Sequence, residues 1–140
     1  MSFLLDTNVI SEIRKPHGNP NVERWFVSIP DDSTFLSALV IGEIRAGIEK
    51  IRRRDPQQTL GLERWIVDLR HRFADRILPV TAEVAEEWAR MNTPNPVPII
   101  DGLIAATAKV HNLTLVTRDT GQLAQHGVRV LNPFDESASP

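Results

Sequence analysis

The sequence predicts an α/β fold in which a mainly parallel sheet is covered by helices on both faces. Short apolar runs, which are typical of buried strands, alternate along the 140 residues with longer segments whose apolar residues recur every three or four positions, as in amphipathic helices. This alternation favours parallel strands, because a parallel pair needs a long crossover connection and a helix usually supplies it.

The first half of the chain is expected to contain two strands and four helices. Residues 3–5 and 34–36 are the apolar runs that predict the strands. The first two helices carry Val9, Ile10 and Ile13, ending near Pro16, and then, after Pro20, Val22, Trp25 and Phe26. Two longer helices follow, with apolar stripes formed by Val40, Ile44, Ile48 and Ile51 and by Leu62, Trp65, Ile66, Leu69 and Phe73.

The second half continues the alternation. Residues 76–80 form a short apolar run, and Thr81 is a suitable N-cap for a helix that bears Val84, Trp88 and Met91. Three prolines predict a stiff, extended loop at 92–98, before a helix at 99–111 and strands at 113–117 and 128–131. We therefore expect a single domain over residues 1–135 and a flexible tail at 136–140.

The composition is that of an ordinary globular domain, with 41% hydrophobic and 24% charged residues. No apolar run approaches the roughly 20 residues that cross a bilayer, and the first residues lack the features of a signal peptide. The absence of cysteine excludes disulfides and thiolate metal sites. These features predict a cytoplasmic protein with no membrane association.

The net charge of −2 provides no overall attraction to nucleic acid. Positive charge is nevertheless dense in one stretch, formed by Lys50, Arg52, Arg53 and Arg54. Two interpretations stay open for this stretch: a solvated helix end, where cations are favourable, or a set of contacts to phosphates.

Acidic residues follow the expected strands. Asp6 comes directly after the first strand and Asp119 comes two residues after the strand at 113–117. Ligands of parallel sheets bind beyond the carboxyl ends of the strands, so both acids are candidate site residues. Asp101 falls in the first turn of its helix. Each of the three also has an ordinary explanation, as a helix cap or as an acid favoured by the helix dipole.

Glu43 lies on the apolar side of its expected helix. A buried carboxylate needs a cation, strong hydrogen bonds or a raised pKa, and an ion pair with Arg45 or Arg118 would also serve. If Asp6, Glu43, Asp101 and Asp119 share one cleft, their repulsion disfavours ionisation unless a multivalent cation lies among them. Oxygen ligands suit Mg²⁺ or Mn²⁺, which can activate water for attack on a phosphodiester.

Other chemistries find little support. The four histidines are scattered without zinc-ligand spacing, and no glycine-rich phosphate loop is present. His111 lies on the apolar side of its helix and is expected to be partly buried. The three tryptophans lie on apolar stripes and are expected in the core.

Five segments together resemble the PIN-domain nucleases, especially toxins of the VapC and FitB types. The segments are residues 4–12, 42–47, 100–108, 115–119 and 127–134, in the same order as in the family and over nearly the whole chain. The resemblance implies a three-layer α/β/α sandwich and an Mg²⁺- or Mn²⁺-dependent endoribonuclease. It also implies an RNA substrate and a homodimer held inactive by a cognate antitoxin protein.

The resemblance also assigns site residues. Asp6, Glu43 and Asp101 match the three core acids of the family, Asn8 and Thr117 match the polar residues that orient them, and Ser37 is a further hydroxyl near the site. Many relatives carry Asn in place of Asp119 and an acid in place of Gln122, while others carry the acid as here, so Asp119 is taken as the fourth carboxylate. Asp6 and Asp101 would bind the metal directly, and Glu43 and Asp119 would complete the shell. Arg118 and the basic stretch would hold flanking phosphates.

Three other functions compete with this interpretation. One is a catalytically silent module of the same fold that acts through an antitoxin or nucleic acid. Another is an aspartyl-phosphate phosphotransferase, which is disfavoured because Asn8 stands where such enzymes carry a second acid. The third is a structure-specific DNA nuclease, for which the chain is too short to form a helical arch.

Overall fold

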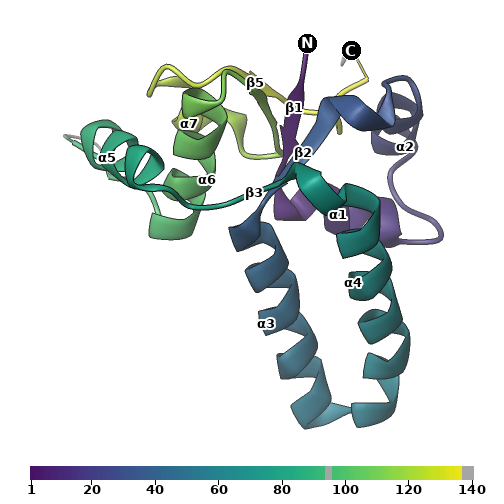
Figure 1. Cartoon of the computed structure of the whole chain (residues 1–140). Coiled ribbons are helices and arrows are strands. Elements are labelled where there is room, and N and C mark those ends of the chain that lie inside the picture. The colour runs from purple at the N-terminus through teal and green to yellow at the C-terminus, as the bar shows by residue number, and fades with distance from the viewer. Residues whose placement is uncertain (94–95, 137–140) are drawn as a thin grey trace.

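Five strands form one sheet at the centre of this computed structural model, which describes residues 1–93 and 96–136 (Figure 1). They are β1 (Phe3–Leu5), β2 (Thr34–Ser37), β3 (Ile77–Leu78), β4 (Thr114–Val116) and β5 (Val130–Leu131). The strands lie in the order β3-β2-β1-β4-β5, and every neighbouring pair is parallel. The predicted α/β class is therefore confirmed, and the chain leaves all five strands at the same edge of the sheet.

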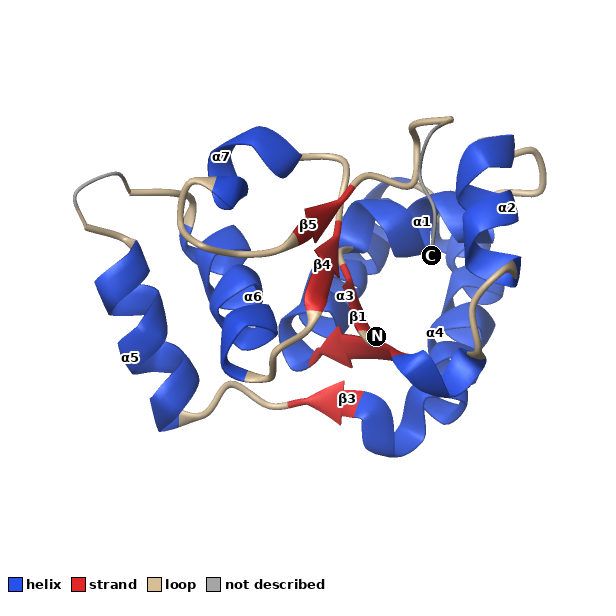
Figure 2. Cartoon of the chain, turned by 90° about the horizontal axis from the view of Figure 1, so that it is seen from above, coloured by secondary structure: helices blue, strands red, loops and turns tan. Residues whose placement is uncertain are grey.

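Helices cover both faces of the sheet (Figure 2). On one side lie α1 (Thr7–Arg14), α2 (Pro20–Val27), α3 (Ala38–Arg54) and α4 (Thr59–Phe73). On the other side lie α5 (Ala82–Met91), α6 (Ile99–Val110) and α7 (Thr120–Ala124). Short 3-10 turns at Asp31–Ser33, Pro56–Gln58 and Ala74–Arg76 join some of these elements. Within the described residues, no helix is both long and apolar enough to cross a membrane.

The central strands have no solvent face. Leu4, Leu5, Leu36 and Leu115 are at most 1% exposed, which explains why these strands are continuous apolar runs and not alternating ones. Trp25 is buried and meets Phe3 edge to face, with ring centroids 5.2 Å apart. Partly buried Trp65 and Trp88 pack against the same core, as the sequence predicted.

The helices α3 and α4 form a hairpin that projects from the body of the molecule (Figure 1). Arg45 and Arg52 of α3 both pair with Glu63 of α4, and both also pair with Glu49. These ion pairs join the two arms of the hairpin on its outer surface.

Two details differ from the sequence-based expectations. Between the predicted strands at 113–117 and 128–131, where no helix was expected, the chain forms the short helix α7, which buries Leu123. His111 is exposed, because α6 ends at Val110 and His111 caps it, so the prediction of partial burial was wrong. In the predicted tail, Glu136 lies in a turn and residues 137–140 fall outside the described residues, as does Pro94 of the proline-rich loop.

Candidate active site

The carboxyl edge of the sheet brings Asp6 and Thr117 together. β1 and β4 pair with Leu5 opposite Val116, so the residues that follow the two strands are neighbours, and the Asp6 N–H donates to the Val116 carbonyl at 2.9 Å. Asp6 is also the N-cap of α1: its Oδ1 accepts the Thr7 N–H at 2.8 Å. Its Oδ2 accepts the Thr117 hydroxyl at 2.8 Å. Both oxygens of this carboxylate are therefore held in place.

Asn8 and Thr117 extend this arrangement to the segment after β4. The Asn8 Nδ2 lies 3.3 Å from Thr117 Oγ1 and 3.5 Å from Asp6 Oδ2, and its Oδ1 accepts the Arg118 N–H at 3.3 Å. The Asp119 N–H in turn donates to Thr117 Oγ1 at 3.1 Å. Thr117 is fully buried, and its one hydroxyl connects the ends of β1 and β4.

Glu43 reaches the same edge from the second turn of α3. Its Oε1 accepts the hydroxyl of Thr7 at 2.6 Å, and the residue is half-buried. The alternative of an ion pair with Arg45 or Arg118 is not realised, because Arg45 pairs with Glu63 and Glu49 and Arg118 lies beside Glu12. Sequence reasoning did not single out Thr7; the available signal was a hydroxyl residue at the first helical position directly after Asp6.

Asp101 and Asp119 complete the acidic set and are both exposed. Asp101 lies in the first turn of α6, and its side chain makes no hydrogen bond to a described residue. Asp119 is the N-cap of α7 but its side chain makes no capping bond, while Gln122 is exposed one turn further on. These two carboxylates are tethered only by their helices.

The acids influence one another electrostatically. Burial raises the pKa of Asp6, hydrogen bonds from Thr117 and Thr7 act in the opposite direction, and the charges of Glu43 and Asp119 raise the pKa further. Although Asp101 is exposed, partial desolvation of its carboxylate raises its pKa, and the charges of Asp6, Glu43 and Asp119 raise it further. The four residues therefore share one electrostatic neighbourhood.

The donor set fits a hard divalent cation in its chemistry. Among the described residues, no Lys, Arg or His forms an ion pair with any of the four acids, so their mutual repulsion is uncompensated. In the part of the chain that the structure describes, however, no three His, Asp or Glu side chains lie close enough together to hold an ion. Binding would require the untethered carboxylates of Asp101 and Asp119 to turn toward Asp6.

Ser37 lies at this edge too, but its hydroxyl serves the helix that follows. Ser37 is fully buried at the end of β2, and its Oγ accepts the Leu39 N–H at 3.1 Å as the N-cap of α3. Within the described residues it makes no hydrogen bond to an acid of the site.

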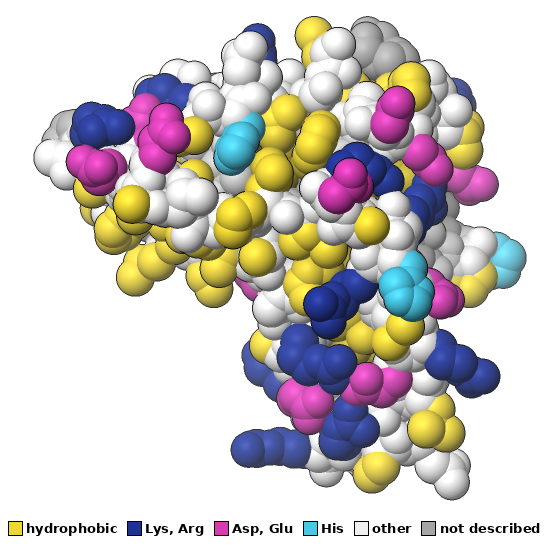
Figure 3. Space-filling view, in the orientation of Figure 1, with side chains coloured by type: hydrophobic (Ala, Val, Ile, Leu, Met, Phe, Trp, Pro, Cys, Tyr) yellow, Lys and Arg dark blue, Asp and Glu magenta, His cyan; other side chains and the backbone are white. Residues whose placement is uncertain are grey.

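The basic stretch is at the other end of α3. It begins seven residues after Glu43, and a helix rises about 1.5 Å per residue, so these cations lie about 10–17 Å from the acid along the helix axis. Dark blue side chains gather on this hairpin in Figure 3. Arg52 forms ion pairs with Glu49 and Glu63. Lys50, Arg53 and Arg54 are exposed and form no ion pair with described residues. The structure does not bring them to the acidic edge.

A parallel α/β sheet with four carboxylates at its carboxyl edge is the architecture expected of a PIN-domain protein. Residues 3–127 match the PIN domain family, and the chain belongs to that family. Toxin FitB of Neisseria gonorrhoeae is 39% identical over 141 residues, which cover 96% of this chain and 99% of FitB. A VapC ribonuclease of Sinorhizobium fredii is 28% identical over 138 residues, 95% of this chain and 98% of that protein.

Solved structures agree with this membership. The structure of FitAB bound to a DNA fragment superposes with a TM-score of 0.75 at 34% sequence identity, and the match covers 95% of this chain and 96% of that chain. The recognition of a PIN domain of the VapC and FitB type is thus confirmed.

Proposed function

We propose that this protein is an Mg²⁺- or Mn²⁺-dependent endoribonuclease and the toxin of a toxin–antitoxin pair. The observation that carries the proposal is that Asp6, Glu43, Asp101 and Asp119 influence one another electrostatically at one sheet edge and have no cationic partner among the described residues. The VapC relative is named a ribonuclease and the FitB relative a toxin, which supports the same activity and role here.

Each acid has a proposed role. Asp6 and Asp101 would hold the ion, and Glu43 and Asp119 would complete its surroundings. Thr117 and Asn8 orient Asp6, and Thr7 orients Glu43. Because hydrogen bonds from Thr7 and Thr117 hold both oxygens of Asp6, this carboxylate is the fixed point of the site.

When bound, a divalent ion supplies polarisation of the scissile phosphate and activation of the attacking water. The protein contributes the geometry: the hydroxyls of Thr7 and Thr117 orient the carboxylates of Glu43 and Asp6. The exposure of Asp101 and Asp119 leaves the site open to a large substrate. RNA as substrate is proposed from the relative named a ribonuclease.

A cognate antitoxin is the proposed protein partner. A groove of about 240 Å³ lies between α1, α3 and α4, and its lining includes Thr7 and Glu43 of the site together with Ile44, Ile48 and Trp65. Such a groove suits an apolar segment of an inhibitor that covers the acids. We also propose a homodimer in the cytoplasm and a single nuclease domain over residues 1–135; Leu60 and Val67, which α4 leaves exposed, offer apolar surface for a second copy.

The test is cleavage of RNA and of DNA of the same sequence by the purified protein, with EDTA, Mg²⁺ or Mn²⁺. We expect RNA cleavage that needs the metal, and a loss of more than about 100-fold in Asp6→Asn, since even outer partners of metal ligands are worth about 10–100-fold. Glu86→Gln, an exposed change on α5, is the matched control and should leave cleavage unchanged.

The alternatives predict different results. A silent binding module would show no cleavage that depends on Asp6, and a DNA nuclease would prefer the DNA strand. A phosphotransferase would become labelled at Asp6 by a phosphoryl donor, which the proposal does not expect. Any of these three outcomes would overturn the ribonuclease assignment.

A further inference from the structure

We propose that Glu12 and Phe134 are positioning residues that hold the guanidinium of Arg118 ready to bind an RNA phosphate beside the scissile one. This inference rests on the proposed ribonuclease function and adds a substrate-binding device to it. It concerns contacts on the side of α1 that faces α2 and the C-terminal segment, outside the acidic set.

The backbone of Arg118 is tied to the acidic edge. Arg118 directly follows Thr117, whose hydroxyl donates to Asp6, and its own N–H donates to Asn8 Oδ1 at 3.3 Å. The residue therefore starts from a fixed point next to the proposed metal ligands.

The side chain of Arg118 is oriented by an aromatic ring. Its guanidinium carbon lies 4.0 Å from the centroid of the Phe134 ring, a cation–π contact. Phe134 is itself held at both backbone groups: its N–H donates to Asn132 Oδ1 at 2.9 Å, and its carbonyl accepts Asn21 Nδ2 at 2.9 Å. The Phe134 residue that carries this ring is thus bound to α2 through Asn21.

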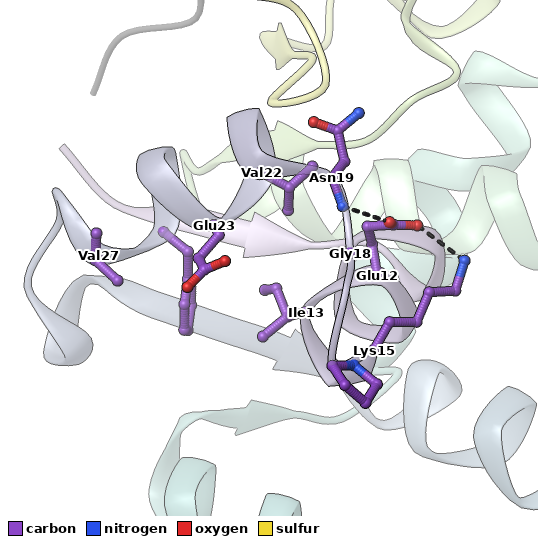
Figure 4. A pocket seen from close by; sticks show the side chains of 10 residues that line it. Glu12, Ile13, Lys15, Gly18, Asn19, Val22, Glu23 and Val27 are labelled. Carbon is purple, nitrogen blue, oxygen red and sulfur yellow. Dashed lines mark hydrogen bonds and ion pairs between the residues drawn. The ribbon is translucent and has the colours of Figure 1, made fainter.

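Glu12 provides a negative charge near the guanidinium. Glu12 Oε1 lies 3.9 Å from Arg118 Nη2, and the Glu12 side chain is only 11% exposed. Figure 4 shows how it is held: Oε2 accepts the Asn19 N–H at 2.7 Å, and Oε1 accepts the Lys15 ammonium at 3.1 Å. The chain passes so close here that a Cβ on Gly18 would lie 2.5 Å from the Glu12 carbonyl oxygen. Glu12 is therefore a rigid anchor.

The guanidinium donors of Arg118 are available to a ligand. Its guanidinium donates no hydrogen bond to a described residue, and its side chain is 56% exposed. Both oxygens of Glu12 are occupied by stronger partners. An arginine fork with fixed orientation and free donors matches the geometry of a phosphate. Arg118 and Lys15 together outweigh the negative charge of Glu12. The resulting positive charge lies beside four acids that would otherwise repel the RNA backbone.

Binding and cleavage by four variants test the inference. Arg118→Gln removes the fork, Phe134→Leu removes the ring, and Glu12→Gln keeps an acceptor for the Asn19 N–H while removing the charge. Arg90→Gln, an exposed arginine on α5, is the matched control for loss of one positive charge. RNA binding is measured by fluorescence anisotropy in the Asp6→Asn background across NaCl concentrations, and KM and kcat are measured with Asp6 intact.

We expect Arg118→Gln to weaken RNA binding about tenfold and to lower the slope of log K against log salt by about one, because one phosphate contact is lost. KM should rise with kcat nearly unchanged. Phe134→Leu and Glu12→Gln should raise KM about threefold, with circular dichroism spectra like those of the unmodified protein. Equal binding and slope in Arg118→Gln and Arg90→Gln would overturn the inference while leaving the ribonuclease assignment intact. A protein that binds RNA through Arg118 but never cleaves it would support the inference and overturn the assignment.

Discussion

The hydroxyl of Thr7 donates to Glu43 Oε1 at 2.6 Å, and this bond joins the first turn of α1 to the second turn of α3. Because the N–H of Thr7 also donates to Asp6 Oδ1, one residue contacts two of the four acids. Thr7 therefore couples the orientation of the long helix α3 to the end of β1.

Removal of this hydroxyl should disturb Glu43 without disturbing the fold. Thr7→Val keeps the shape and the N–H bond to Asp6 but leaves a half-buried carboxylate without its donor. We expect about 10–100-fold slower cleavage, as for other partners of metal-binding groups, and a loss of about 1 kcal/mol in the free energy of unfolding. Rate assays and thermal denaturation check this, with Thr93→Val as the exposed control. Unchanged kcat would contradict a role for Thr7.

Asp101 should cost stability at neutral pH in the absence of metal. Partial desolvation of its carboxylate, and then the charges of Asp6, Glu43 and Asp119, raise its pKa in the folded protein above the unfolded value of about 4. Its favourable contribution is therefore fully present below about pH 4 and is lost as the pH rises through the raised folded pKa. Asp101→Asn, in EDTA, should have a higher Tm than the parent at pH 7 and an equal Tm near pH 3.5. A lower Tm at pH 7 would show that the carboxylate is compensated.

Thr117 should influence the pH dependence of cleavage. Its hydroxyl bonds to the ionised form of Asp6 and so lowers the pKa of that acid. Thr117→Val should therefore raise the pKa of Asp6 and move the acidic limb of the rate profile to higher pH, whereas Thr117→Ser should restore it. Profiles of kcat/KM against pH distinguish these outcomes. A fall in rate at every pH without a displaced limb would indicate a purely structural role.

Gly102 should tolerate no side chain, although it lies inside a helix where alanine is intrinsically better by about 1 kcal/mol. A Cβ on Gly102 would meet Trp88 Cδ1 at 2.9 Å and Val97 Cγ2 at 3.0 Å. Gly102→Ala should therefore lower the Tm and displace the adjacent Asp101. Gly42→Ala is the control, because nothing lies within 4 Å of its added Cβ, and it should raise the Tm. Thermal denaturation of the pair decides the point; equal gains would contradict the close packing.

Helices and strands were predicted more successfully from the sequence than side-chain contacts, because their signals are local. Phe3 to Leu5 followed by Asp6 indicated a buried strand that ends at an acid, and the spacing of Val40, Ile44 and Ile48 indicated α3. Each of these two signals is carried by residues that lie close together in the sequence. The predicted helix at 99–111 ended one residue too late, because periodicity cannot show where a C-cap begins. The helix α7 was missed because Leu123 is its only buried residue.

Such local patterns could not predict the side-chain contacts of the site. Thr7 and Glu43 are 36 residues apart, and Arg45 and Glu63 are 18 apart, so no periodicity links either pair. The sequence left Arg45 open as a partner of Glu43, but α3 turns Arg45 toward α4 instead. The acids themselves could be named because each follows a strand or opens a helix; which hydroxyls hold them depends on tertiary structure.

The bond between Thr117 and Asp6 spans 111 residues. β1 sits between β2 and β4, so the middle of the sheet cannot close until β4 has been synthesised. At about 5–20 residues per second, the ribosome needs roughly 6–22 seconds to travel that distance. A nascent chain that stalls before Thr117 thus carries Asp6 without its supporting hydroxyl, so the acidic site is assembled only after the ribosome has passed Asp119.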